Sequence, residues 1–159
     1  MSVPIKVAKW SGTFPEIAHY VADATNGAAI VTGSLVLLAS DGELEICGAD
    51  PAAFLGVALG DFNGAAGYGM PSGVTQVTYR EQKIPVALGI QTTLFEIKGS
   101  SAPTLTNVDT DYGVALSAGI WTLDLTETTA KVFHVVDVDI ERAVFIVRFL
   151  AAGNQAVII

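Results

Sequence analysis

The sequence predicts an all-β protein with little helix, arranged as a sandwich or a barrel. Asp41-Gly42 stands between two short segments that read as strands, which is typical of a β-hairpin. Several more short stretches rich in apolar and β-branched residues follow, separated by Gly, Pro, Asn, Asp or Ser. Many short strands with turn signals at this spacing are typical of sandwiches and barrels.

The first ten residues alternate apolar and polar side chains and carry two lysines on an otherwise acidic chain. They form either the first strand of the domain or an arm that adds a strand to the sheet edge of a neighbouring protein. On the second interpretation residues 1–12 are the arm and residues 13–159 are a single β domain. The residues then expected to contact the partner are Val3, Ile5, Val7 and Trp10.

The next segment, residues 15–24, is the best candidate for a helix. Ile17, Ala18 and Val21 fall at helical spacing within it. The following Thr25-Asn26-Gly27 would end such a helix early.

Residues 33–40 and 43–47 are the two strands that flank Asp41-Gly42, and a type I′ turn is expected between them because Asp-Gly tolerates two positive φ angles. Residues 35–38 are apolar on both faces, which predicts a strand inside a sheet or under a partner.

Asp50-Pro51 predicts a turn before the next strand, and residues 60–73 form a glycine-rich loop without a basic residue. Residues 99–111 predict a second loop, rich in Ser, Pro, Thr, Asn and Asp. The remaining strands are predicted at 53–59, 74–79, 83–88, 94–98, 113–116, 120–125, 131–140, 143–150 and 156–159.

The composition favours an oligomer or an attached subunit. Of the 159 residues, 51% are hydrophobic and 15% are charged, whereas a typical globular domain has about 25% charged residues. A length of 159 residues fits one domain. So few charges would leave apolar patches on a monomer, and such patches usually mark partner surfaces.

The charge balance argues against nucleic acid and membrane partners. The net charge is −8 with eight Lys and Arg in all, so the chain lacks a basic stripe for phosphates or for an acidic membrane surface. Its single cysteine excludes an intramolecular disulfide, and the first residues lack the pattern of a signal peptide. We therefore expect a protein partner and a soluble protein made in the cytoplasm.

No residues form a persuasive nucleophile and base, so we expect no enzyme and no cofactor. Ser117 lies in a near match to the G-x-S-x-G elbow, but residues 120–124 alternate like a strand where that motif needs a helix. Cys47 shares a strand face with Glu43 and Glu45, whose negative charges disfavour a thiolate.

His134 precedes three carboxylates, but strand geometry separates it from them. In a regular strand His134 shares a face with Val136, Val138 and Ile140, whereas Asp137, Asp139 and Glu141 lie on the opposite face unless a bulge intervenes. We expect a solvated strand face here and no metal. A cation held by these carboxylates together with Asp109 and Asp111 remains the alternative.

Three segments resemble bacteriophage capsid decoration (cement) proteins. The first is the hairpin Gly33-x-Leu-Val…Asp41-Gly42-x-Leu, and the second is Ala49-Asp50-Pro51-Ala52 followed by Leu55-Gly56-Val57-Ala58. The third is the closing pair 131–139 and 143–150, which runs into IVRFLAAGNQAVII. Together they cover about half of the chain.

The resemblance implies a small β-barrel or β-tulip-like domain with an extended N-terminal arm. It implies a structural virion protein on the outer surface of an icosahedral capsid, a homotrimer that clamps neighbouring subunits of the major capsid protein. The alternative is an oligomeric receptor- or glycan-binding module of a phage head or tail, which would use the loops at 60–73 and 99–111.

Overall fold

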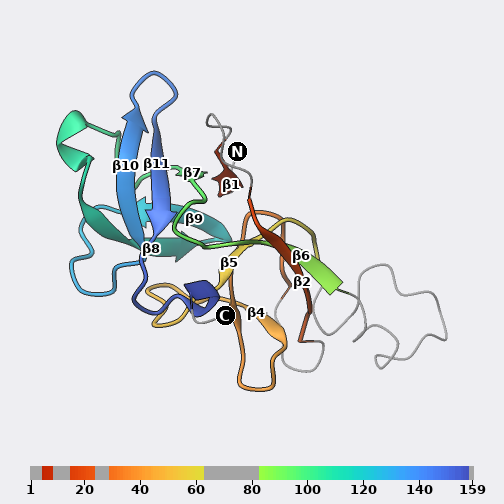
Figure 1. The fold of residues 1–159 in the computed structure, drawn as a ribbon. Coiled ribbons are helices and arrows are strands. Elements are labelled where there is room, and N and C mark those ends of the chain that lie inside the picture. The colour runs from red at the N-terminus through yellow and green to blue at the C-terminus, as the bar shows by residue number, and fades with distance from the viewer. Residues whose placement is uncertain (1–4, 9–14, 24–28, 63–82, 158–159) are drawn as a thin grey trace.

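The computed structural model describes residues 5–8, 15–23, 29–62 and 83–157, and their regular structure is almost entirely β (Figure 1). One antiparallel sheet has the order β1 (Lys6–Val7), β7 (Phe95–Ile97), β11 (Val144–Phe149), β10 (Phe133–Asp139), β8 (Asp111–Ser117), β9 (Ile120–Asp124). The other has the order β2 (Ile17–Val21), β6 (Lys83–Leu88), β5 (Gly56–Ala58), β3 (Leu35–Leu38), β4 (Leu44–Ile46). The two described 3₁₀ turns are Leu105–Asn107 and Gln155–Val157.

Both sheets curl back on themselves. The first curls until β9 meets the chain just past β7, where the Leu123 N–H donates to the Lys98 carbonyl at 2.8 Å. In the second, Ala22 follows β2 and forms a parallel bridge with Leu44 of β4. Curling of this kind covers sheet edges that would otherwise present unpaired backbone groups. The prediction of an all-β, barrel-like domain is therefore confirmed.

The five-stranded sheet lies between two apolar clusters. Leu35 and Val57 face the larger cluster, which the six-stranded sheet encloses, and Val36 and Ala58 face the smaller one. All four side chains are fully buried. The prediction that residues 35–38 form a strand inside a sheet is confirmed. Because the strand is buried on both faces, apolar and polar side chains do not alternate along it.

The hairpin is confirmed, but its turn differs from the expected type I′. Gly42 has φ +82°, and Asp41 is not among the described residues with positive φ. The Gly42 N–H donates to the Ala39 carbonyl at 3.0 Å, and the Ala39 N–H donates to the Glu43 carbonyl at 2.9 Å. This is a type I turn followed by a glycine in the left-handed region, which spaces the strands by one more residue than a two-residue turn.

The helix predicted at residues 15–24 is wrong. Ile17–Val21 is strand β2, paired in antiparallel register with β6 from Ile17↔Ala87 to Val21↔Lys83. The segment is short and contains Ile, His, Tyr and Val, which lose rotamer freedom in a helix but pack well on a sheet. Backbone pairing with β6 outweighs its weak helical spacing.

The C-terminal segment connects the two sheets. The strand predicted at 156–159 is not found in the described part, where Gln155–Val157 is a 3₁₀ turn. The Gln155 side chain accepts from the Leu38 N–H and donates to the Leu38 carbonyl, each at 2.8 Å. The Asn154 Nδ2 donates to the Gly89 carbonyl at 2.6 Å. Residues 158–159, the strand predicted at 74–79 and most of the loop at 60–73 lie outside the described residues.

Candidate functional site

Four strands of the six-stranded sheet, β1, β7, β11 and β10, present an outer face that is turned away from the larger core. Cross-strand partners run across it from Lys6 to Glu96, from Glu96 to Ile146 and from Ile146 to Asp137. Directly paired residues lie on the same face of a sheet, so these four side chains form one row.

A β-bulge at Val136 places the carboxylates of Asp137 and Asp139 on this outer face. Val135 pairs with Val147 and Asp137 with Ile146, so Val136 is the extra residue. Before the bulge Val135 is fully buried in the larger core, and after it Val138 packs against the same core. The side chains of His134, Asp137 and Asp139 therefore share a face, contrary to the arrangement expected for a regular strand.

Glu96 is the most buried charged group of the row and is held by two cations. Arg142 contacts it through two nitrogens, at 3.0 Å and 2.7 Å, and the Lys6 Nζ lies 3.2 Å from Oε2. The Glu96 side chain is 10% exposed. The Arg142 guanidinium, together with Lys6, holds the pKa of the Glu96 carboxyl below its ordinary value, although burial acts in the opposite direction. The bidentate geometry fixes the position of Arg142.

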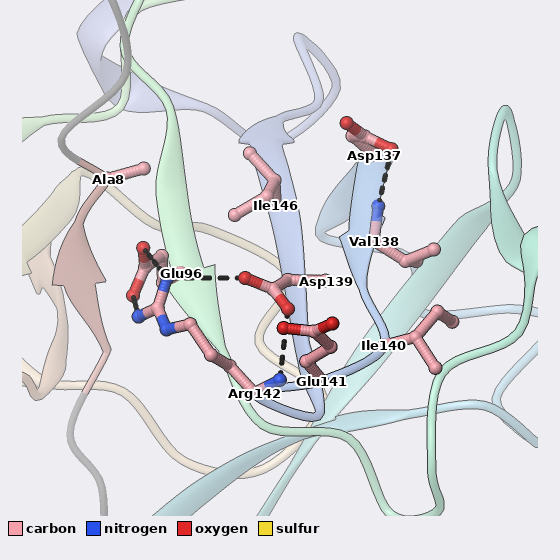
Figure 2. A pocket seen from close by; sticks show the side chains of 9 residues that line it. All are labelled: Ala8, Glu96, Asp137, Val138, Asp139, Ile140, Glu141, Arg142 and Ile146. Carbon is pink, nitrogen blue, oxygen red and sulfur yellow. Dashed lines mark hydrogen bonds and ion pairs between the residues drawn. The ribbon is translucent and has the colours of Figure 1, made fainter.

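Beside this ion pair the outer face is hollowed, with a volume of about 430 Å³. We name this space the outer hollow. Figure 2 shows Ile146 between Ala8 and Asp137, with Arg142 and Glu96 paired at one side and Ile140 at the rim. The residues that line it are Ala8, Glu96, Asp137, Val138, Asp139, Ile140, Glu141, Arg142 and Ile146.

Apolar side chains form the floor of the outer hollow. Ala8, Val144 and Ile146 are buried and make a small cluster of their own, with Leu94 packed against it. Ile140 at the rim is 53% exposed. The outer hollow therefore combines an apolar floor with a ring of charged groups.

A second, smaller cluster lies further along the same face, around His134. Its Nδ1 is 2.7 Å from Asp111 Oδ1, and its Nε2 is 3.4 Å from Asp109 Oδ1. Arg148 is the cross-strand partner of His134 on β11. The hollow here has a volume of about 400 Å³ and includes Val108 and Asp109 of the loop predicted at 99–111. Sequence reasoning missed the pairing of His134 with these two aspartates because it depends on the register of β10 with β8.

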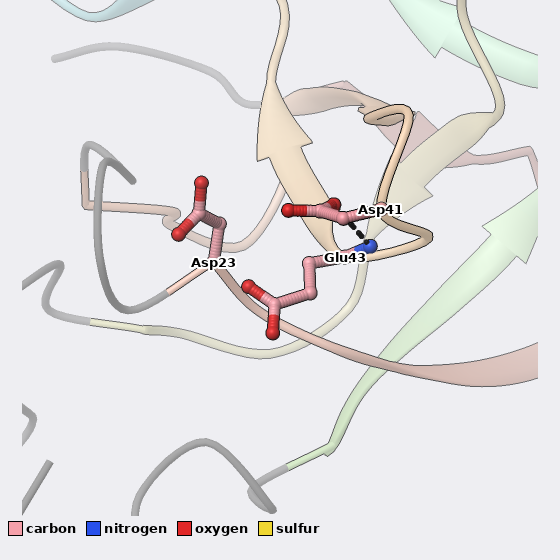
Figure 3. A group of neighbouring side chains, drawn as sticks. All are labelled: Asp23, Asp41 and Glu43. Atoms are coloured by element: carbon pink, nitrogen blue, oxygen red, sulfur yellow. Dashed lines mark hydrogen bonds between the residues drawn. The ribbon is translucent and has the colours of Figure 1, made fainter. Parts of the chain in front are cut away.

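A third group of charges lies on the five-stranded sheet. Carboxylate oxygens of Asp23, Asp41 and Glu43 lie within 4.8 Å of one another (Figure 3). Burial, followed by a hydrogen bond with Asp23, raises the pKa of the nearby Glu45 carboxyl. Hard divalent cations accept such oxygen donors. The residues share a corner because Asp23, two residues beyond the end of β2, donates its N–H to the carbonyl of Leu44 at the start of β4.

The residues predicted to contact a partner are Val3, Ile5, Val7 and Trp10, and the structure describes only some of them. Val3 and Trp10 lie outside the described residues. Ile5 is 2% exposed and belongs to the larger core, and Val7 is partly buried against it. Lys6–Val7 pairs with β7 of the same chain, which corresponds to the first-strand interpretation of this segment.

The residues weighed for catalysis are not brought together. Ser117 ends β8 at the turn into β9, whereas His134 pairs with Asp111 at the opposite end of β8. Cys47 is 1% exposed, and burial raises the pKa of its thiol to about 12. It follows β4 on the same strand face as Glu45, but its side chain lies in the larger core, whereas Glu45 is half-buried.

Comparison of the chain with protein-family models and with curated proteins gave no match. Among the described residues, no helix has the length and apolar character needed to cross a membrane.

Proposed function

We propose that this chain is a structural virion protein, a capsid decoration subunit that binds the outer surface of an icosahedral phage head. It stabilises contacts between neighbouring major capsid proteins and acts as a homo-oligomer, with a trimer as the expected form. Its role is mechanical and involves no catalysis and no cofactor.

The observation that carries the proposal is the resemblance of three segments to decoration proteins, and these segments adjoin one another in the fold. The hairpin β3–β4 pairs with β5, and Phe54, just before β5, forms a bridge with Asn154 beyond β11. The Phe54 and Phe149 rings lie 5.4 Å apart. The resembling segments therefore build the junction between the two sheets rather than scattered surface loops.

The composition supports the same role. A decoration protein needs one apolar surface for its own copies and another for the shell, and 51% of this chain is hydrophobic. Large apolar side chains remain exposed on several described strands, including Ile17 at 48% and Ile120 at 38%. Removing such area from water is favourable by about 25 cal/mol per Å², and many copies on one shell gain avidity.

Co-sedimentation tests the proposal directly. Purified chain is mixed with heads of the phage that encodes it, stripped of the protein, and the amount that pellets is measured. We expect saturable binding at a fixed ratio to the major capsid protein. Absence of binding at micromolar concentration would refute the proposal.

A truncation tests the N-terminal arm within the same assay. Because Ile5 is buried in the core and Lys6–Val7 pairs with β7, deletion must stop before Ile5. Removal of residues 1–4 with Trp10→Ala should weaken shell binding while the thermal unfolding midpoint is maintained. Unchanged binding would show that Val3 and Trp10 do not contact the shell.

The alternative function is that of a receptor- or glycan-binding module, which would use the hollow beside His134 as its binding site. The loop predicted for binding at 99–111 contributes Val108 and Asp109 to that hollow. A glycan array with the full chain distinguishes the two functions, because a decoration subunit should give no specific signal on it.

A further inference from the structure

We propose that Leu105 is an anchor residue that inserts into an apolar pocket of a shell subunit. The anchor rests on the proposed function and deepens it, because it names the side chain that makes the contact and the kind of pocket that receives it. Leu105 belongs to the 3₁₀ turn Leu105–Asn107, in the loop between β7 and β8.

Exposure is the first reason. Leu105 is 75% exposed, more than any other large hydrophobic side chain in the described part of the chain. Single exposed apolar side chains are common on protein surfaces, so exposure alone does not mark a contact. Leu105 is distinguished by the way in which the surrounding loop holds it.

The turn is fixed internally by side-chain hydrogen bonds. The Thr104 N–H and hydroxyl both donate to Asn107 Oδ1, at 2.8 Å and 2.9 Å. The Asn107 N–H donates to the Thr104 carbonyl at 3.0 Å, and the Thr104 and Thr106 hydroxyls are hydrogen-bonded at 2.8 Å. These bonds connect the residues on both sides of Leu105, so its backbone is ordered before any partner arrives.

The loop is also tied to the six-stranded sheet. The Asn107 Nδ2 donates to the Tyr112 hydroxyl at 3.0 Å, and the Asp109 N–H donates to the Val135 carbonyl at 2.9 Å. Pro103, just before the turn, is buried. In Figure 1 the turn is the short green coil beside β10, at the edge of the molecule. An anchor on a rigid support loses little conformational entropy on binding, and this preorganisation increases affinity.

The chemistry of the loop favours an apolar pocket in a protein. Residues 99–108 contain no charged side chain, although the chain has a net charge of −8. Thr104 and Thr106 are exposed on either side of Leu105, and their hydroxyls suit the polar rim that surrounds the apolar centre of an interface. One leucine between hydroxyl groups buries too little apolar area to hold a lipid surface.

A second copy of the chain is a poor occupant, because both hollows described above are bordered by charged side chains. Glu96 and Arg142 border the outer hollow. Asp109 and Arg148 border the hollow beside His134. A leucine that entered either hollow would take charged groups out of water, and the net charge of −8 on each copy opposes association. The favoured occupant is therefore a different protein, which under the proposed function is a shell subunit.

Co-sedimentation of the full chain with stripped heads tests the anchor, with the bound amount measured over a range of concentrations. Leu105→Ala should raise the concentration for half-saturation about tenfold, because most of the apolar area of the anchor is lost. Leu105→Asp should abolish binding at concentrations that saturate the unaltered chain. The thermal unfolding midpoint of both variants should stay unchanged, since the side chain is exposed.

Val31→Asp is the matched control. Val31 is 51% exposed and also lies in a turn, where the Ser34 N–H donates to its carbonyl at 2.9 Å shortly before β3. The substitution adds the same charge and should leave binding unchanged. Equal weakening by Val31→Asp and Leu105→Asp would contradict the assignment.

A second variant tests the rigid support. Asn107→Ala keeps Leu105 but removes the side-chain bonds to Thr104 and Tyr112. It should weaken binding about threefold, because the loop must then be ordered on binding. Undiminished binding would contradict the preorganised anchor.

The same measurements separate the anchor from the proposed function. If the Leu105→Asp chain sediments with heads as well as the unaltered chain, the anchor is wrong and the decoration role stands. If the unaltered chain binds no head, the decoration role fails and the anchor fails with it. Sedimentation velocity of the free chain tests the other occupant. A smaller assembly for Leu105→Asp than for the unaltered chain would show that Leu105 contacts a second copy, which would also overturn the inference.

Discussion

Replacement of Phe149 by alanine should destabilise the whole molecule because this ring joins the two sheets. Phe149 is fully buried on β11 and its ring centroid lies 4.5 Å from that of Phe133 and 5.1 Å from that of Phe95, both on the six-stranded sheet. Phe54 approaches from the other sheet at 5.4 Å. The ring also lies against Gly89, where an added Cβ would come within 2.8 Å of it.

The magnitude follows from this burial. Truncation of a fully buried phenylalanine costs about 3–5 kcal/mol, and the three rigid rings around it cannot collapse into the space. We expect a loss of about 4 kcal/mol in the free energy of unfolding. For a domain of this length that loss lowers Tm by about 8–16 °C. Phe149→Leu fills most of the space and should cost about 1 kcal/mol.

Urea unfolding monitored by tryptophan fluorescence measures the loss. Trp121 is 3% exposed in the same cluster as Phe149 and reports its environment. A Trp10→Phe background removes the other tryptophan. Ile17→Ala, at a side chain 48% exposed, serves as the control and should change the free energy of unfolding by no more than about 0.5 kcal/mol. A loss below about 1 kcal/mol for Phe149→Ala would refute the packing described here.

Three further perturbations probe other parts of the structure. The lowered pKa of Glu96 means that its ionised form stabilises the fold above its unfolded pKa, and that this stabilisation is lost as pH falls through the folded pKa. Glu96→Gln should therefore lower the free energy of unfolding by about 2 kcal/mol at pH 7 in urea unfolding, and the difference between the two proteins should narrow as acid protonates Glu96. A gap that stays constant with pH would contradict the ion pair. Gly56→Ala should cost at least about 2 kcal/mol, since its Cβ would collide with the Ala87 carbonyl, whereas Gly48→Ala meets nothing within 4 Å and should be nearly neutral in the same assay. With burial raising its pKa to about 12, Cys47 should not react with a thiol reagent at pH 8 until urea unfolds the chain; rapid reaction of the native protein would show that the site is open.

The strand content was predictable because it depends on local pattern. Residues 83–88 match β6, and the hairpin around Asp41-Gly42 pairs Leu38 with Leu44 as a short turn requires. The predictions failed where a distant partner decides the structure. Residues 15–24 have helical spacing, but β6, more than sixty residues away, pairs with five of them. Nothing within the segment signals that partner.

The candidate site was less predictable than the fold. The bulge at Val136 exists because of the register between β10 and β11, and it alone brings Asp137 and Asp139 onto the same face as His134. Glu96 and Arg142 are 46 positions apart, and only the pairing of β7 with β11 places them together. By contrast, the position of residues 35–38 inside a sheet could be predicted from the segment alone, because a strand that is buried on both faces has apolar residues at consecutive positions.

Counting the copies of this chain in purified particles tests the decoration role most directly. Quantitative mass spectrometry of heads from the phage that encodes it gives the ratio of this chain to the major capsid protein. A subunit that coats the shell should be present in hundreds of copies per particle at a fixed ratio. A few dozen copies at one vertex or in the tail, or none at all, would contradict that role.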